Sequence, residues 1–194
     1  IINLDSSFTG SDLLRTRLRS GNFNAGQPFG RGNDAWGGTI GLQERGFGSN
    51  NQVVVDRAFY QFPIGEDFTA TFGAIVRQDD MLGIWPSDYP SDSILDTLTY
   101  AGANAAYSLA QGTGFGLSYL SDSGRWSATL LGISTDGTDA VNGGVFTDDS
   151  RDVYTGQIGY LGERWRIAYA YTVDDNDGAV GVNANGLGFQ DDGV

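Results

Sequence analysis

Arginine provides the clearest chemical signal in this sequence, because all 11 basic residues are arginine and none is lysine. Arg15, Arg17 and Arg19 occupy alternate positions, and Leu14 and Leu18 lie between them. Side chains two residues apart share one face of a β-strand, so this stretch presents a cationic face and an apolar face. A guanidinium keeps its charge and binds carboxylate or phosphate groups through two hydrogen bonds. Such a strand separates an aqueous medium from an apolar one.

Three more arginines are expected to project to the same side from later strands. Alternation within those strands places Arg57, Arg77 and Arg166 on their polar faces. The sequence therefore predicts a polar wall that lines a pore and is formed by the side chains of Arg15, Arg17, Arg19, Arg57, Arg77 and Arg166.

Aspartates are concentrated in the long connections between strands. We hypothesise that the connection at 78–113 folds inward and narrows the pore, and that its carboxylates face the arginines; these are Asp80, Asp88, Asp92 and Asp96. Rings of fixed charge are one way in which pores select ions. The alternative is that the arginines only pair with buried acids and that the loop aspartates only face solvent. The sign of selectivity stays open, since acidic loops attract cations and an arginine ladder favours anions.

Composition excludes several classes of site. The chain has no cysteine and no histidine, which removes thiol and imidazole nucleophiles, disulfides and metal sites built from nitrogen or sulfur. The glycines at 112–116 precede a strand instead of a helix, and the acidic stretch at 174–178 lacks the carboxylates that a calcium loop requires. No carboxylate pair stands out for hydrolysis, so we expect no enzyme and no cofactor. The net charge of −13 argues against a nucleic-acid partner.

The positions of apolar alternation and of turn residues predict an all-β chain. Eight strands are expected, at residues 2–8, 13–20, 53–62, 68–76, 114–120, 125–133, 153–161 and 165–173. A short strand at 39–43 and a short helix within 93–110 are further candidates, and a polar tail begins at 174. The connections alternate between short and long, which is typical of an up-and-down antiparallel transmembrane β-barrel. No apolar run is long enough for a membrane-spanning helix.

Aromatic residues give a second indication of a membrane barrel. They flank the short turns and are expected on the apolar face, as in an interfacial girdle; they are Phe8, Phe62, Phe68, Tyr119, Trp126, Tyr160 and Trp165. The same apolar face is predicted to continue along the strand at 68–76 as far as Val76. Asp56 is the exception, because alternation places its carboxylate on the apolar face of the strand at 53–62. Either a neighbouring subunit covers Asp56 or the strand register breaks there.

Two stretches resemble a known family. LDSSFTGSDLLRTRLRSGN at 4–22 closely resembles a hallmark segment of the cyanobacterial outer-membrane porins, also called iron uptake porins, of the OprB-like carbohydrate-selective porin family. VVVDRAFYQFPIG at 53–65 resembles the next hairpin arm of that family. Beyond residue 113 only the rhythm of strands and turns supports the likeness.

The resemblance implies a homotrimeric barrel of roughly 16 to 18 strands in the cell outer membrane, with a water-filled channel. Residues 1–194 would then be a partial barrel of about eight strands, without the family's N-terminal surface-layer-homology domain and without the remaining strands. An eight-stranded closed barrel is the alternative. The expected function is passive diffusion of small hydrophilic solutes and inorganic ions, including iron, with the lipid bilayer as a partner. The alternative is an exported soluble β-sandwich that binds calcium or sugar through acidic loops.

Overall fold

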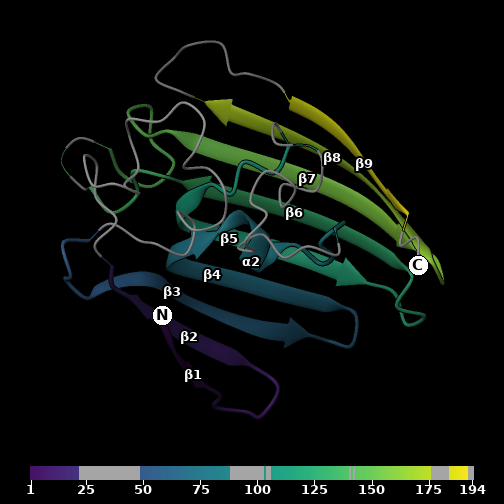
Figure 1. The fold of residues 1–194 in the computed structure, drawn as a ribbon, viewed down its shortest axis with the longest axis horizontal. Helices are drawn as coiled ribbons and strands as arrows, with labels where there is room; N and C mark the ends of the chain where they lie inside the picture. Colours follow the sequence, from purple (N-terminus) through teal and green to yellow (C-terminus); the bar gives the residue numbers. More distant parts are fainter. Residues whose placement is uncertain are drawn as a thin grey trace.

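The computed structural model describes residues 1–21, 49–87, 103, 106–139, 141 and 143–175, together with the backbone of 184–191. Within these residues the chain forms nine strands and one short helix (Figure 1). The strands are β1 (Ile2–Ser6), β2 (Leu13–Arg19), β3 (Val54–Ile64), β4 (Phe68–Arg77), β5 (Gln111–Leu120), β6 (Trp126–Ser134), β7 (Asp152–Leu161), β8 (Trp165–Asp175) and β9 (Ala184–Asp191). The helix α2 (Gln78–Met81) directly follows β4.

All nine strands belong to one antiparallel sheet whose spatial order equals the chain order. The all-β, up-and-down prediction is therefore confirmed, and the eight predicted strands all occur with small shifts at their ends. The prediction of a polar tail after residue 174 was wrong in part. The segment contains strand β9, which pairs with β8 from Trp165↔Asp191 to Thr172↔Ala184. The strand was missed because its residues are mostly polar or glycine, so it lacks a regular alternation of apolar side chains.

The predicted helix within 93–110 lies mostly outside the described residues, so that prediction stays untested. Helix α2 lies at the start of the second long connection, ahead of the 93–110 stretch in which a helix was expected. Of that stretch the structure describes 103 and 106–110, which are not helical, and the expected strand at 39–43 lies outside the described residues. Within the described part of the chain, no helix is long and apolar enough to cross a membrane.

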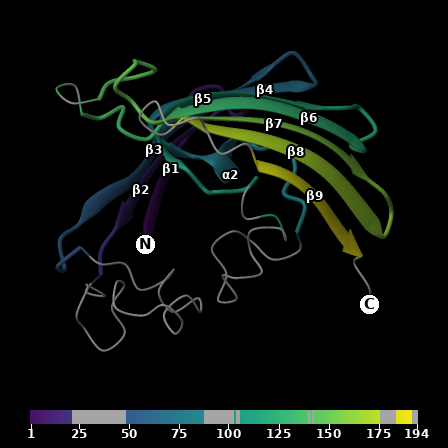
Figure 2. The same cartoon turned by 90° about the horizontal axis from the view of Figure 1, so that it is seen from above.

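The sheet is strongly curved. Seen from above, the strands arch around a concave side, and α2 lies on that side (Figure 2). The six strands from β3 to β8 contain between 9 and 11 residues each. These strands are about twice as long as the usual strand of a globular protein, which has about five or six residues.

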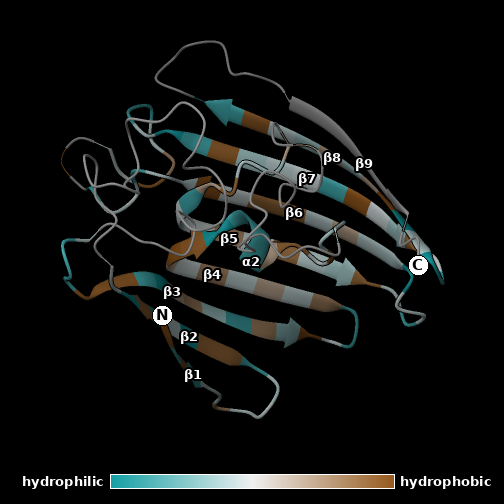
Figure 3. Cartoon of the chain, in the orientation of Figure 1, coloured by the Kyte–Doolittle hydropathy of each residue, from teal (hydrophilic) through white to brown (hydrophobic). Residues whose placement is uncertain are grey.

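Hydrophilic and hydrophobic residues alternate along the strands (Figure 3), and the two faces of the sheet differ in polarity. The convex face carries large apolar side chains that remain exposed, such as Phe72 at 53%, Leu130 at 70% and Ile158 at 60%. The concave face carries buried polar side chains, including those of Thr129, Gln157 and Thr172. Because successive side chains of a strand point to opposite faces, this arrangement follows from the alternation in the sequence. It reverses the usual order, in which the covered face of a sheet is apolar.

A β-bulge in β4 places Val76 on the other face of the sheet from the one predicted. Gly73 pairs with Gly114 and Val76 pairs with Gly112, so Ala74 and Ile75 together oppose a single residue of β5. The extra residue turns Val76 to the concave side, contrary to the prediction. There Val76 joins a small buried apolar cluster with Phe59, Met81, Leu131 and Ile133.

Gly116 on β5 makes room for α2. Gly112, Gly114 and Gly116 occupy the alternate positions of β5 that are buried. A Cβ atom added to Gly116 would lie 2.9 Å from Met81 Cβ and 3.0 Å from Met81 Sδ. The absence of a side chain at Gly116 therefore allows Met81 of α2 to pack directly on the strand.

We predict that Gly116→Ala destabilises the protein, because the added methyl group overlaps Met81 of α2. Overpacking of this kind costs about 1–3 kcal/mol in the free energy of unfolding. The matched control is Gly156→Ala, whose Cβ would meet only Leu130 Cδ2 at 3.4 Å on the convex face; we expect a change within about 0.5 kcal/mol. Urea titrations measure both values, and equal effects of the two substitutions would contradict the packing argument.

The turn between β1 and β2 is organised around the carboxylate of Asp12. Its oxygens accept hydrogen bonds from Ser7 Oγ at 2.6 Å, Thr9 Oγ1 at 2.6 Å, Thr9 N at 2.7 Å and Phe8 N at 3.1 Å. Tyr60 Oη on β3 also donates to Asp12, at 2.8 Å. The hydroxyls of Ser7 and Thr9 are the main reason that the pKa of Asp12 lies well below its usual range. The motif at 6–12 therefore fixes both the turn and its position against β3.

We predict that acid loosens this turn. Because folding lowers the pKa of Asp12, its stabilising effect is complete above the unfolded pKa of about 3.9 and is lost as the pH falls toward the lower folded value. Hydrogen-exchange protection of the Phe8 and Thr9 amides measures the effect. Protection should decrease as the pH falls below about 4, and in Asp12→Asn it should be low and independent of pH. Protection that is the same in both proteins at neutral pH would disprove the role of the carboxylate.

Candidate functional site

Four of the six predicted arginines gather on the concave side of β2 and β3. Their positions follow from the strand register, in which Asp5 opposes Arg15 and Arg17 opposes Arg57. Three carboxylates lie among them. We call this group the charge cluster, and it consists of Asp5, Arg15, Arg17, Arg19, Asp56, Arg57 and Asp80.

Asp56 enters the charge cluster through a β-bulge. Arg17 pairs with Arg57 and Leu18 pairs with Val55, so Asp56 is the extra residue of β3. Its carboxylate is 4% exposed and lies 3.4 Å from Arg57 Nη1, 3.6 Å from Arg19 Nη1 and 3.9 Å from Arg17 Nη1. The expectation of an apolar setting was therefore wrong, and a broken register is the alternative that holds. These arginines balance the charge of Asp56, so no subunit contact is needed to compensate it.

Arg57 is the most deeply buried member, with no exposed side-chain surface. Its Nε donates to Asp80 Oδ2 at 2.6 Å, and its Nη1 donates to the carbonyl of Asp56 and to Gln111 Oε1, both at 2.7 Å. Asp80 in turn accepts a hydrogen bond from the backbone N–H of Arg77 at 3.0 Å, at the start of α2. Arg57 thus links β3, β5 and α2 at one point.

The remaining members form a ladder along β2. Arg15 donates two hydrogen bonds to Asp5, from Nε at 2.9 Å and from Nη2 at 2.8 Å. Arg17 Nε donates to Asn3 Oδ1 at 2.9 Å. These side chains are more exposed than Arg57, since 25% of Arg15 and 14% of Arg17 remain accessible. They form the accessible edge of the charge cluster.

Arg77 and Arg166 lie outside the charge cluster, although Arg166 has the same alternation as the concave-face residues Ala168, Ala170 and Thr172 of β8. Arg77 donates from Nε and Nη2 to the carboxylate of Asp79, each at 2.6 Å, next to α2. Arg166 Nη1 donates to the carbonyl oxygens of Trp85 and Ser87, at 3.2 and 3.3 Å. Both arginines therefore hold the second long connection in place.

The second connection folds inward, as hypothesised, in each part that the structure describes. Gly83 N donates to Thr129 Oγ1 of β6 at 2.9 Å. Gln78 Nε2 donates to Thr155 Oγ1 of β7 at 2.7 Å and to the carbonyl of Ala106 at 2.9 Å, so one amide ties both ends of the connection to the sheet. Of its predicted aspartates, Asp80 faces Arg57, whereas Asp88, Asp92 and Asp96 lie outside the described residues.

Sequence reasoning missed the uncharged residues that anchor the connection. Gln78 is fully buried, and Tyr107 Oη accepts a hydrogen bond from Gln157 Nε2 at 2.8 Å. Thr172 Oγ1 donates to the carbonyl of Ala106 at 2.7 Å. The alternation of polar residues in β7 and β8 is a signal that could have placed Gln157 and Thr172 on one face, but nothing in the sequence indicates their partners.

The charge cluster carries more positive than negative groups. Four guanidiniums of the charge cluster face three carboxylates, which leaves a small excess of positive charge. Arg57 Nη2 is buried without a hydrogen-bond partner. Among the described residues there is no group of three or more carboxylates that could hold a metal ion.

The chain matches no family model, and it has no significant match among curated proteins or solved structures.

We predict that Asp80→Asn is much more damaging than Asp5→Asn. The first substitution removes the carboxylate that Arg57 contacts in a buried site, where breaking one ion pair costs about 3–5 kcal/mol. The second removes the partner of a partly exposed pair, where the cost is about 0–1 kcal/mol. Free energies of unfolding from denaturant titrations compare the two. A loss for Asp80→Asn no larger than that for Asp5→Asn would show that the Arg57–Asp80 pair does not hold α2.

Proposed function

We propose that this chain forms part of an outer-membrane β-barrel that acts as a porin, admitting small hydrophilic solutes and inorganic ions by passive diffusion. One observation carries the proposal: large apolar side chains are exposed on the convex face while polar side chains are buried on the concave face. A barrel wall in lipid has this polarity, because its outer face contacts acyl chains and its interior is wet. The remaining strands of such a barrel would lie outside the described sheet.

Strand length supports a spanning role. A transmembrane strand needs about 9–11 residues when tilted across the hydrocarbon core. Strands β3 to β8 have 9 to 11 residues, and short turns of a few residues join them at one end of the sheet. A hairpin sheet in a soluble domain has no requirement for uniform strands of this length.

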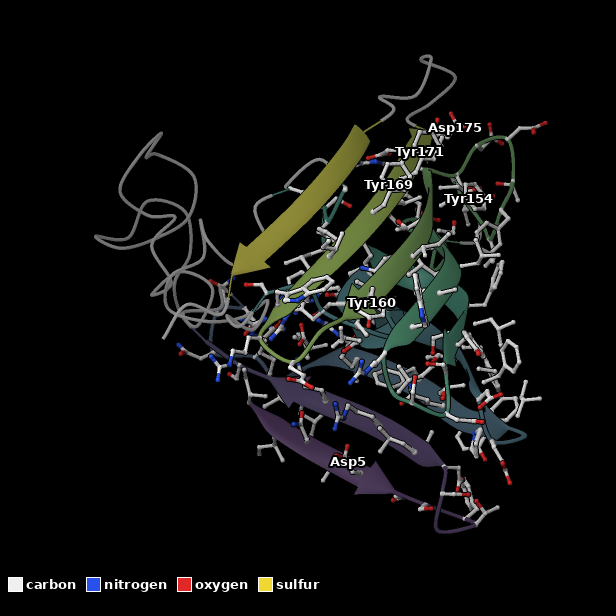
Figure 4. The ribbon with its side chains drawn as sticks, turned by 90° about the vertical axis from the view of Figure 1, so that its right-hand side faces the viewer. Asp5, Tyr154, Tyr160, Tyr169, Tyr171 and Asp175 are labelled. Atoms are coloured by element: carbon white, nitrogen blue, oxygen red, sulfur yellow. The ribbon has the colours of Figure 1, made fainter. Side chains whose placement is uncertain are left out.

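Aromatic contacts along the short-turn end of the sheet support an interfacial girdle. The ring centroids of Phe68 and Tyr119 lie 5.2 Å apart, and the ring of Tyr160 contacts those of Trp126 and Trp165 at 4.8 and 5.2 Å. Toward the opposite end of the strands lie further convex-face aromatics, Tyr154 on β7 and Tyr171 on β8 (Figure 4). Two aromatic bands that flank an apolar zone are the pattern of outer-membrane barrels.

The inward connection and the charge cluster supply a selective constriction. The connection is hydrogen-bonded to β6, β7 and β8, so it narrows the interior on that side. Solutes would then pass on the side of β1 to β3, where Arg15, Arg17 and Arg19 are partly accessible. Four arginines against three acids favour a modest anion preference. The acidic connections outside this region attract cations and so reduce this anion preference.

The segments at 4–22 and 53–65 support the assignment to a cyanobacterial-type porin by resemblance. On that basis we propose a homotrimer in the cell outer membrane, and iron among the permeating ions. The structure adds a physical reason for the first segment, since Asp12 organises its turn and its arginines form the ladder.

The alternative of a soluble binding sandwich gains no support from the contacts. A sandwich requires a second sheet on the apolar face. Within the described residues only one sheet occurs, and its apolar face is uncovered. We therefore retain the alternative only as an outcome of the experiment.

The test is conductance of the full-length protein in a planar bilayer, with the reversal potential measured across a salt gradient. We expect stepwise openings in groups of three. Replacing Arg15, Arg17 and Arg19 together by serine should shift the reversal potential toward cation selectivity, because three fixed positive charges are lost. The matched control is Arg151→Ser, an exposed arginine paired with Asp174, which should leave the potential unchanged.

The outcomes distinguish the role of the arginines in selectivity from the porin function itself. An unchanged reversal potential in the triple variant would reject the role of the arginines and leave the channel intact. Absence of conductance from folded protein, together with solubility in buffer without detergent, would reject the porin and favour the soluble sandwich.

A further inference from the structure

A groove on the convex face runs across β6, β7 and β8. Its volume is about 730 Å³, and it is lined by Trp126, Ile158, Tyr160, Trp165, Ile167 and Tyr169. The lining is aromatic and aliphatic, and several of these side chains are half exposed. The volume lies within the range of about 300–1,000 Å³ that is usual for small-ligand sites. We call this feature the aromatic groove.

One end of the aromatic groove lies at the level of the short turns. Trp126 begins β6 and Trp165 begins β8, and each follows directly on a turn. Tyr160 lies between them in the sheet, since it pairs with Trp126 on one side and with Ile167 on the other. Figure 4 labels two of its lining residues, Tyr160 on β7 and Tyr169 on β8. A groove with a tryptophan-rich end therefore extends from the membrane interface toward the centre of the apolar zone.

Two arginines lie in the short turns next to the interfacial end of the aromatic groove. Arg125 directly precedes Trp126, and Arg164 directly precedes Trp165. Backbone bonding holds the two turns together, because Leu161 N donates to the carbonyl of Arg125 at 2.7 Å. These are the sole cationic residues of the short turns that the structure describes.

The carboxylates near these arginines do not neutralise them tightly. Arg125 Nη2 lies 3.8 Å from Glu163 Oε1, and both side chains are largely exposed, at 51% and 87%. An exposed pair of this kind contributes about 0–1 kcal/mol, so it competes weakly with another anion. Asp122 is also exposed, and Arg164 has no ion pair among the described residues.

We propose that the aromatic groove binds an anionic phospholipid. One acyl chain lies along Ile158, Ile167 and Tyr169, and the phosphate accepts hydrogen bonds from Arg125 and Arg164 at the interface. Apolar burial supplies the contact for the chain, and guanidinium groups bind phosphate through two parallel hydrogen bonds. The inference rests on the proposed membrane insertion of this face. It adds a specific lipid site to a surface that would otherwise contact lipid without preference.

The experiment uses quenching of tryptophan fluorescence by phospholipids with brominated acyl chains. Trp36 and Trp85 are replaced by phenylalanine, so that Trp126 and Trp165 are the reporters. The protein is reconstituted in phosphatidylcholine vesicles that contain a fixed minor fraction of brominated phosphatidylglycerol, or the same fraction of brominated phosphatidylcholine. We expect brominated phosphatidylglycerol to quench more strongly than its mole fraction accounts for, and brominated phosphatidylcholine to show no such excess.

Two variants test the role of the headgroup contact. Arg125→Gln combined with Arg164→Gln should abolish the excess quenching, because the phosphate loses its donors. Glu163→Gln, the matched control in the same turn, should preserve or increase it, because a competing carboxylate is removed. Excess quenching that persists without both arginines would overturn the headgroup assignment.

A reporter elsewhere on the convex face separates this inference from the proposed function. Phe72 of β4 is exposed and lies far from the aromatic groove in the strand order. With Trp126 and Trp165 replaced by phenylalanine, Phe72→Trp should be quenched only in proportion to mole fraction. If this reporter is quenched and the groove reporters are not, a second copy of the chain covers the groove and the lipid site is disproved. If no reporter is quenched, membrane insertion itself is disproved.

Discussion

The structure depends on the compensation of one buried charge. The guanidinium of Arg57 has no exposed surface, and burial of an isolated charge is costly unless it is paired and hydrogen-bonded. Three features of the chain meet this requirement together. The bulge in β3 brings the carbonyl and carboxylate of Asp56 close to Arg57. Asp80 of α2 and Gln111, the first residue of β5, accept hydrogen bonds from the same guanidinium. Removing the Asp80 carboxylate would leave Arg57 without its shortest charged contact.

This compensation explains why the second connection turns inward. Asp80 reaches Arg57 only if the chain bends immediately after β4, and α2 produces that bend. Gly116 then allows Met81 to lie against β5, and Gln78 bonds to β7. The concave face is consequently filled on the side of β5 to β8 and holds its charged residues on the side of β1 to β3. A single connection thus determines which part of the concave face is covered and which charged residues stay accessible.

The concave face of the sheet carries polar groups that need hydrogen-bond partners, whereas the convex face carries exposed apolar side chains. On the concave side, polar groups are satisfied by the inward connection, as in the bond between Thr129 and Gly83. On the convex side, the described residues place nothing over the band that includes Leu130 and Ile158. Exposed apolar surface of this extent marks a surface that contacts another apolar medium or partner. The membrane proposal and the lipid site both follow from this one asymmetry.

The sequence by itself determined the strands, their antiparallel order and the identity of the two faces. Alternation has a period of two residues and short turns join neighbours, so these properties are local. For the same reason the sequence identified Arg15, Arg17 and Arg19 as one row and the aromatic residues as one band. It failed where alternation is interrupted or weak, at the bulges that redirect Asp56 and Val76 and in the glycine-rich strand β9. The partners of Gln78, Arg77 and Arg166 were decided only by the tertiary structure, because a bond between residues 77 positions apart, such as Gln78–Thr155, depends on how the whole sheet curves.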